Sequence, residues 1–247
     1  MSQRDKFGGA DEEPRIAGVA VAKVTNNEDP EGLGRVKVTY PFRDAEDESY
    51  WARIATEMAS SDYGTFFLPE VGDEVLVAFE DGNIRYPYVV GSLYTGKKKP
   101  PQSNKDGKNN VREIKSRSGH VLDFDDTSGE EKVKIETKAG HTITLDDKSG
   151  SEKITIEDKS GSNAITMDSA KGEVSIEGQQ KISLSAPTVE LSADSEVKIA
   201  AKGKVNMEGK GQVNVSSKGQ LNVESNGIMG IKATGPLTVK GAIIQLN

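Results

Sequence analysis

The chain has no cysteine among its 247 residues, which excludes disulfides, thiolate metal sites and cysteine nucleophiles. Aromatic residues make up 5% and hydrophobic residues 34%, low values for a globular protein. No run of 18 apolar residues occurs, and the polar, charged residues 1–13 do not resemble a secretory signal. The net charge of −7 argues against general nucleic-acid binding. Such polarity usually indicates disorder, but an elongated protein has the same composition because it has little interior per residue, and the repeat described next argues against disorder.

An eight-residue repeat occupies the last quarter of the chain, with the form G-x-φ-x-φ-x-x-x, where φ is apolar. The first apolar position holds Val189, Val197, Val205, Val213, Leu221, Met229 and Leu237. The second holds Leu191, Ile199, Met207, Val215, Val223, Ile231 and Val239. The repeat glycines, two residues before the later pairs, are Gly203, Gly211, Gly219, Gly227 and Gly235. These residues are the predicted core and corners of a needle.

Two apolar residues spaced by two lie on one face of a strand, so each octad predicts a short strand followed by a turn. Glycine ahead of the strand suits a corner with positive φ or a crowded backbone. Stacked strands of this kind form a β-helix or β-prism. Three chains wound together pool their apolar side chains and cover each other's strand edges, which favours a homotrimer. A single-chain solenoid with three octads per turn is the alternative.

Similar apolar pairs precede the octads at longer intervals. They start at Leu122, Val133, Ile143, Ile154, Ile165, Val174, Ile182 and Val189, and the steps shorten from eleven or ten residues to seven before settling at eight. If the lost residues come from the turns, the shaft narrows toward its C-terminus. With about 4.8 Å per strand, ten units predict a shaft on the order of 50 Å.

The N-terminal third predicts a small closed barrel after a flexible arm at residues 1–14. Alternating apolar residues mark strands near 16–21, 36–40, 50–55, 75–79 and 86–94, and the EDGN sequence at 80–83 predicts a hairpin. Residues 58–72 are expected to form a loop. Five strands in about 80 residues suit an OB-fold, with Tyr40, Trp51 and Phe79 in its core.

Four segments of this barrel resemble one family: DPEGLGRVKVTYPF (29–42), YWARIA (50–55), PEVGDEVLVAFEDGN (69–83) and PYVVGSLYTGKKKPP (87–101). They are similar to the OB domain of phage baseplate assembly protein V and VgrG-type spike proteins of contractile injection systems. GHVLDFDD (119–126), GHTITLDD (140–147) and the octads resemble that family's needle. The resemblance implies an all-β chain: an N-terminal OB-fold at 15–96, a linker at 97–112 and an intertwined trimeric β-helix needle at 113–247, with octads from about residue 173.

The resemblance also implies function and partners. The expected role is a structural homotrimeric central spike that seats under a tail hub and punctures a target membrane, in a phage tail, a type VI apparatus or an extracellular injection particle. Effector cargo is a further partner of such machines. The spike would be made in the bacterial cytoplasm without a signal peptide and delivered outside on contraction. No hub domain precedes the barrel and no lysozyme domain follows it, so a separate hub protein and no enzymatic activity are expected.

Catalytic residues, cofactors and metals are not expected. His120 and His141 occupy equivalent repeat positions and could bind an axial metal, although a polar turn role accounts for them too. The pairs Asp125-Asp126 and Asp146-Asp147 could act as general acid and base, but each precedes a Ser-Gly turn and fits turn chemistry. The Lys97–Lys99 run reads either as a solvated linker or as a contact for an acidic partner.

The octad pattern breaks after Val239, where an apolar run containing Ile243, Ile244 and Leu246 follows Gly241. Exposed apolar side chains beside open strand edges favour a contact surface, so these residues are the expected dock for a PAAR-type tip protein. In the alternative they fold over and plug the axis.

A polysaccharide-binding or depolymerising tailspike is the alternative function. It would need paired carboxylates in a groove and exposed aromatic residues, whereas Phe124 is the only aromatic residue beyond Tyr94.

Overall fold

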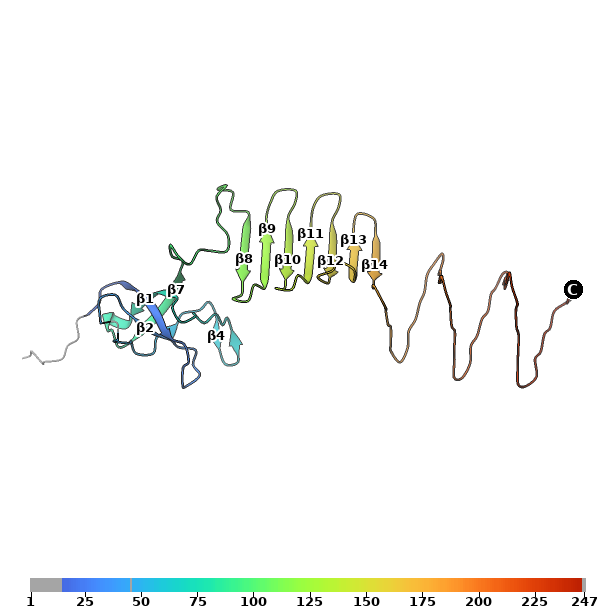
Figure 1. Ribbon diagram of the computed structural model, residues 1–247, viewed down its shortest axis with the longest axis horizontal. Coiled ribbons are helices and arrows are strands. Elements are labelled where there is room, and N and C mark those ends of the chain that lie inside the picture. The colour runs from blue at the N-terminus through green and yellow to red at the C-terminus, as the bar shows by residue number, and fades with distance from the viewer. Residues whose placement is uncertain (1–14, 45, 246–247) are drawn as a thin grey trace, which may run out of the picture. The chain divides into compact units, whose positions relative to one another are not determined.

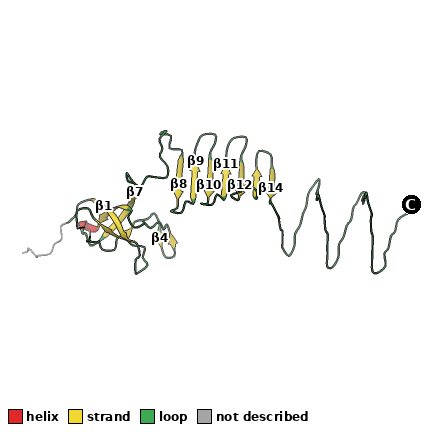
Figure 2. Ribbon diagram, in the orientation of Figure 1, coloured by secondary structure: helices red, strands yellow, loops and turns green. Residues whose placement is uncertain are grey.

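The computed structural model describes residues 15–44 and 46–245 (Figure 1), so the expected arm at 1–14 and Leu246 lie outside the described residues. Within those residues it consists of strands, turns and one 3₁₀ segment (Figure 2). No helix of the described ranges is long and apolar enough to cross a membrane. The chain divides into one unit ending at Ser183 and a second beginning at Leu184. The all-β class predicted from the sequence is confirmed.

The N-terminal barrel is one five-stranded sheet in the order β2-β1-β6-β7-β3. Its strands are β1 (Val19–Asn26), β2 (Lys37–Thr39), β3 (Arg53–Ile54), β6 (Glu74–Phe79) and β7 (Pro87–Leu93). The two outer members meet through an antiparallel bridge, in which Val36 N–H donates to Ala52 O at 3.0 Å and Ala52 N–H to Val36 O at 2.7 Å. This bridge closes the sheet into a barrel, as expected from the five predicted strands.

The barrel interior is filled by the inward residues of the alternating strands. Its buried residues are Ala22, Val24, Val36, Val38, Tyr40, Ala52, Val75, Val77, Phe79, Ile84 and Val89. Tyr40 and Phe79 therefore lie in the core as predicted, and burial raises the pKa of Tyr40 to about 12. Tyr40 stacks on Phe42 with ring centroids 5.2 Å apart.

Trp51 is not a core residue, which corrects the sequence prediction. Its ring is only partly buried, and the Arg35 and Lys37 cations lie 5.8 and 5.5 Å from its centroid. The adjacent Ala52, rather than Trp51, points into the barrel. Because neighbouring strand residues face opposite sides, the bridge between Val36 and Ala52 leaves the indole on the outer face.

The turn-rich segment between β1 and β2 is ordered around one carboxylate. Asp29 accepts hydrogen bonds from Arg35 Nη2 at 2.7 Å and Nε at 2.8 Å, and from the backbone N–H groups of Glu31 and Leu33. The Arg35 side chain, together with these N–H groups, holds the pKa of Asp29 well below its ordinary value. A fork-shaped guanidinium bound at two points fixes the loop's geometry as well as its charge.

The predicted hairpin at the EDGN turn is confirmed, because β6 and β7 pair antiparallel across η1 (Glu80–Gly82). The expected loop at 58–72 is partly wrong, because it contains a short ribbon of β4 (Ala59–Ser60) and β5 (Tyr63–Gly64). Asp62, with φ of 65°, makes the reversal, and a Cβ at Gly64 would lie 2.5 Å from Met58 O. A left-handed aspartate and a close backbone approach explain this ribbon better than strand propensity does.

Residues 111–177 form a second sheet, an antiparallel meander of seven strands in sequential order. The strands are β8 (Val111–Lys115), β9 (Val121–Asp125), β10 (Lys132–Glu136), β11 (Thr142–Asp146), β12 (Lys153–Glu157), β13 (Ala164–Asp168) and β14 (Glu173–Glu177). Each predicted pair from Leu122 to Val174 starts at the second residue of its strand. Strand β8 begins within the expected linker and was not anticipated, because Arg112 occupies one of its apolar-pair positions.

Residues 184–245 form the second unit, and every one of them is exposed. They run as extended segments separated by bends, and no strand is assigned within them (Figure 2). The five repeat glycines all lie in these bends. Strand assignment needs a hydrogen-bonded neighbour, and the octads have none within one chain; their strand character therefore stays a prediction.

Candidate functional site

The sheet of residues 111–177 carries one continuous apolar face. Cross-strand pairing aligns one residue of each strand into a row consisting of Ile114, Leu122, Ile135, Ile143, Ile156, Ile165 and Ile176. A second row, two residues along each strand, consists of Phe124, Val133, Leu145, Ile154, Met167 and Val174. Directly opposed side chains in such rows stabilise the sheet through their contacts.

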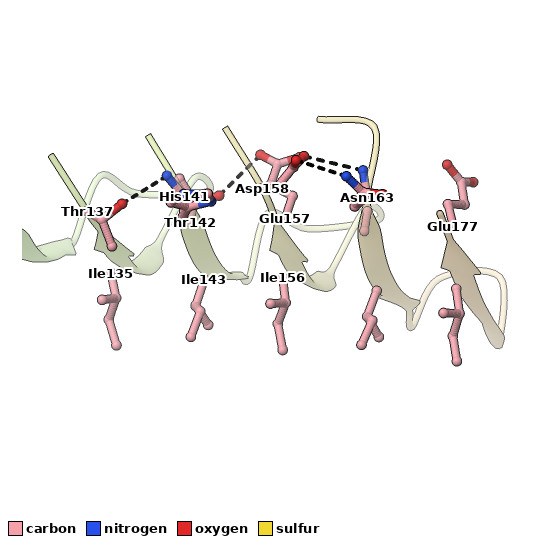
Figure 3. Close-up of a pocket in the computed structure, with 13 residues that line it drawn as sticks. Ile135, Thr137, His141, Thr142, Ile143, Ile156, Glu157, Asp158, Asn163 and Glu177 are labelled. Atoms are coloured by element: carbon pink, nitrogen blue, oxygen red, sulfur yellow. Dashed lines mark hydrogen bonds between the residues drawn. The ribbon is translucent and has the colours of Figure 1, made fainter. Parts of the chain in front are cut away.

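This apolar face is uncovered in the single chain. Ile143 is 38% exposed and Val174 is 68% exposed, although such side chains belong in a core. Figure 3 shows Ile135, Ile143 and Ile156 pointing to the same side of the sheet. A hollow of about 490 Å³ lies over this region, and it includes His141, Asp158 and other turn residues in its lining. A contiguous apolar face of this extent marks an interaction surface.

The opposite side of the sheet is polar. Its central column, one residue from each strand, runs through Glu113, Asp123, Lys134, Thr144, Thr155, Thr166 and Ser175. The two faces thus differ as strand alternation requires, with apolar side chains on one side and polar ones on the other. The apolar side is the one left needing a partner.

Two carboxylates lie side by side at the start of the polar column. Glu113 and Asp123 pair across β8 and β9, and the Glu113 side chain is only 7% exposed. Glu113 Oε1 and Asp123 Oδ1 are buried and have no hydrogen-bond partner among the described residues. Burial, followed by the neighbouring Glu113 and Asp125 carboxylates, raises the pKa of Asp123 above its ordinary value. This pair is a local electrostatic cost within the sheet.

The two histidines serve the turns of the sheet. His120 Nδ1 accepts a hydrogen bond from the backbone N–H of Lys138, and His141 Nδ1 accepts one from Lys159 N–H, both at 3.3 Å. Each imidazole thereby links its turn to the turn 18 residues further along. Among residues 15–44 and 46–245, no three His, Asp or Glu side chains gather in a way that could hold a metal ion.

The aspartate pairs also have turn partners. Asp125 Oδ1 accepts hydrogen bonds from Thr127 N–H at 3.0 Å and Thr127 Oγ1 at 2.6 Å, and these contacts lower its pKa. Asp146 Oδ1 accepts Lys148 N–H at 3.0 Å. Both aspartates make the Asx-type turns expected from their sequence context.

The octad residues predicted as needle core are all exposed in the single chain. The first apolar position is less exposed than the second: Val213 is 52% and Val215 66% exposed. At the docking segment, Ile243 is 82% and Ile244 is 52% exposed. The predicted core thus consists of apolar side chains that are exposed in the single chain.

The barrel carries exposed rings that sequence reasoning did not single out. Tyr63, Phe66 and Phe67 follow the β4–β5 turn and are 64%, 74% and 69% exposed. The sequence signal that could have identified this exposed group is the pair of adjacent phenylalanines in a segment expected to be a loop.

The basic run of the linker contacts the barrel through one lysine. Lys98 Nζ donates hydrogen bonds to Gly72 O at 2.9 Å and to Asp73 Oδ1 at 2.6 Å.

Comparison with known proteins shows which protein family the barrel resembles. Residues 20–94 match the family described as the type VI secretion system/phage-baseplate injector OB domain. The barrel is therefore similar to injector OB domains. This agrees with the barrel's strand order and its closure between Val36 and Ala52.

Similar proteins extend the relationship beyond the OB domain. The type VI secretion system spike protein VgrG3 of Vibrio cholerae is 32% identical over 132 residues, which cover 49% of this chain and 13% of that protein. VgrG2a of Pseudomonas aeruginosa is 33% identical over 129 residues, covering 47% and 15%. The actin cross-linking toxin VgrG1 of V. cholerae is 30% identical over 132 residues, covering 49% and 12%. The chain is therefore a relative of VgrG-type spike proteins, and the match spans about one eighth to one seventh of their length.

The neighbouring carboxylates of Glu113 and Asp123 lead to a prediction about how stability depends on pH. Because the folded pKa of Asp123 is raised, its ionised carboxylate lowers stability at neutral pH, and stability rises as the pH falls through that raised pKa. Asp123→Asn is expected to raise the thermal midpoint at pH 7, and the difference from wild type should vanish below about pH 4. Circular dichroism melts of the whole protein across this range measure it.

The matched control is Asp126→Asn, at an exposed carboxylate that pairs with Arg112 on the same sheet. This substitution should give no gain in thermal midpoint at pH 7. A wild-type or lower midpoint for Asp123→Asn at pH 7 would contradict the assigned cost.

Proposed function

We propose that this protein is the homotrimeric central spike of a contractile injection machine. The observation that carries the proposal is the uncovered apolar face of residues 111–177, continued by the octad pairs, on a chain that contains an injector OB domain. Three copies would turn these faces toward a common axis and bury them. Such a dry core with cross-strand hydrogen bonds gives a stiff shaft, which suits a part that concentrates force on a small area of target membrane.

The needle would have two parts with different strand pairing. Residues 111–177 pair their own strands, so each chain would supply one face of a three-sided prism. Residues 178–245 have no strand partner within the chain, so their octads would pair with those of the other two copies. The shorter step supports this division, because eight residues hold a strand and a corner but no hairpin turn.

The partners follow from this role. The barrel would seat under a separate hub protein, and the exposed Phe66 and Phe67 support a protein contact at the barrel. Effector cargo and a PAAR-type tip protein are further partners, and the target membrane is contacted transiently. The spike would be assembled into a baseplate or type VI apparatus, and no catalytic role is assigned to it. Any metal ion at the tip would be bound by the tip protein and not by this chain.

Electron microscopy of the purified protein tests the proposal. A spike is expected to appear as a thin threefold rod with a knob formed by the barrels. Monomeric barrels with disordered tails would contradict the proposal. So would a wide, single-chain solenoid with an open groove, the shape expected of a tailspike that acts on polysaccharide.

The assigned register of the octads is tested by two neighbouring substitutions. Val213→Asp places one carboxylate per chain on the axis side, where an unpaired buried charge costs about 3–5 kcal/mol. Gln212→Asp changes the neighbouring outward position and should have little effect. Thermal melts of the trimer should therefore separate the two variants widely. Equal melting would refute the register, because a slip of one residue exchanges the faces.

The docking segment is tested by deleting residues 242–247. The truncated spike is expected to remain trimeric, because its octads are intact, and to lose capture of a PAAR-type tip protein in a pull-down. Capture with unchanged affinity would exclude Ile243, Ile244 and Leu246 as the dock. Loss of the trimer itself would favour the alternative in which these residues plug the axis.

A further inference from the structure

The outward side of the octads changes its chemistry in the last two complete repeats. The outward positions are the first, third and fifth residues after each repeat glycine. In the repeats opened by Gly203, Gly211 and Gly219 they hold Lys204, Asn206, Glu208; Gln212, Asn214, Ser216; and Gln220, Asn222, Glu224. In the repeats opened by Gly227 and Gly235 they hold Ile228, Gly230, Lys232; and Pro236, Thr238, Lys240. The latter six residues are here named the collar.

Side-chain contacts support the assignment of these positions to one face. Gln212 Nε2 donates to Asn214 Oδ1 at 2.8 Å, and Gln220 Nε2 donates to Asn222 Oδ1 at 2.9 Å. The residues one and three places after the glycine therefore lie on the same face. The apolar residues two and four places after the glycine lie on the opposite face. The repeats opened by Gly211 and Gly219 thus present a hydrogen-bonded amide surface to solvent.

The collar replaces that amide surface with an apolar one. Ile228 stands where Gln212 and Gln220 stand in earlier repeats, and it is 98% exposed, whereas its neighbour Met229 is 47% exposed. Pro236 occupies the same position one repeat later, and Gly230 replaces the asparagine. An isoleucine on the outward side gains nothing from a trimer core, so burial between the chains does not explain it.

The end of the needle also becomes positively charged. Between residues 184 and 224 five acidic and five basic side chains balance, whereas residues 225–247 contain Lys232 and Lys240 and no carboxylate side chain. At the fifth position, Glu208, Ser216 and Glu224 give way to these two lysines. The trimer would therefore carry six lysines around a ring of isoleucine and proline.

We propose that the collar binds the surface of a membrane containing anionic phospholipids. This inference rests on the proposed trimeric spike and adds the chemistry of its membrane contact. Apolar side chains that enter the headgroup boundary while flanking lysines meet lipid phosphates are the combination that such surfaces recognise. The orange-to-red segment in Figure 1 contains these repeats.

Vesicle co-sedimentation of the full-length protein tests the collar. The probes are vesicles of phosphatidylcholine alone and of equal parts phosphatidylcholine and phosphatidylglycerol. Wild type is expected to favour the anionic vesicles, and Lys232→Glu/Lys240→Glu should lower its partition coefficient more than tenfold, since each lysine near an anionic surface contributes about 1 kcal/mol. Ile228→Gln, which leaves the charge unchanged, should also weaken binding; unchanged binding would reduce the collar to a simple anion site and overturn the proposal.

The matched control is Lys204→Glu/Lys210→Glu, which makes the same change in net charge in earlier octads and should shift binding less than twofold. Equal effects of the two double variants, or equal wild-type binding to both vesicles, would overturn the proposal. Unchanged vesicle binding by the collar variants, with loss of a co-purifying small protein detected by mass spectrometry, would assign the collar to protein docking instead. Light scattering on each sample keeps the two proposals apart: a trimer that ignores vesicles refutes only the collar, whereas a wild-type monomer refutes the spike.

Discussion

Burial of the apolar residue pairs that are exposed in the single chain is the constraint on which the proposed architecture depends. Two apolar residues per short strand give the sheet of residues 111–177 one apolar face, and that face remains open in the single chain. A β-sheet with one bare apolar face is not a stable end state in water, because burying each such side chain is worth about 1.5–3 kcal/mol. The barrel, by contrast, closes on itself and buries its own core.

The same constraint acts differently on the two halves of the proposed needle. In the meander the chain satisfies its backbone hydrogen bonds alone and leaves only side chains to be covered. In the octads, residues 184–245 form no strand pairing within the chain, and their apolar pairs are exposed as well. The glycines reflect this difference. Hairpin glycines such as Gly140 and Gly150 have φ of 90° and 78°, whereas the octad glycines lie in bends without positive φ. Tight reversals need left-handed glycine, and the wider octad bends do not.

The features that sequence analysis predicted are those governed by local alternation. The pairs from Leu122 to Val174 locate six strands, and Val75, Val77 and Phe79 locate a barrel strand, because a period of two is visible in the sequence itself. Strand β8 escaped prediction since Arg112 breaks its alternation, and its place is set by pairing with β9. Trp51 was expected in the core, but the bridge that fixes its orientation depends on Val36, which is distant in sequence.

The candidate site likewise has some features that could be predicted from the sequence and others that could not. The apolar rows could be predicted as a face, because i and i+2 residues share a side of a strand. The proximity of the Glu113 and Asp123 carboxylates could not be predicted, because it arises from the cross-strand register of β8 and β9. The needle core at Val189 to Val239 stays a prediction, since its partner strands would belong to other copies of the chain.

The most direct test of this account is the mass of the purified protein in solution, measured by light scattering over a dilution series down to micromolar concentration. The account predicts a homotrimer of three 26.5 kDa chains that does not dissociate on dilution and resists mild SDS. A folded, stable species with the mass of one chain would contradict it, because the apolar face and the octads would then have to be covered within a single molecule.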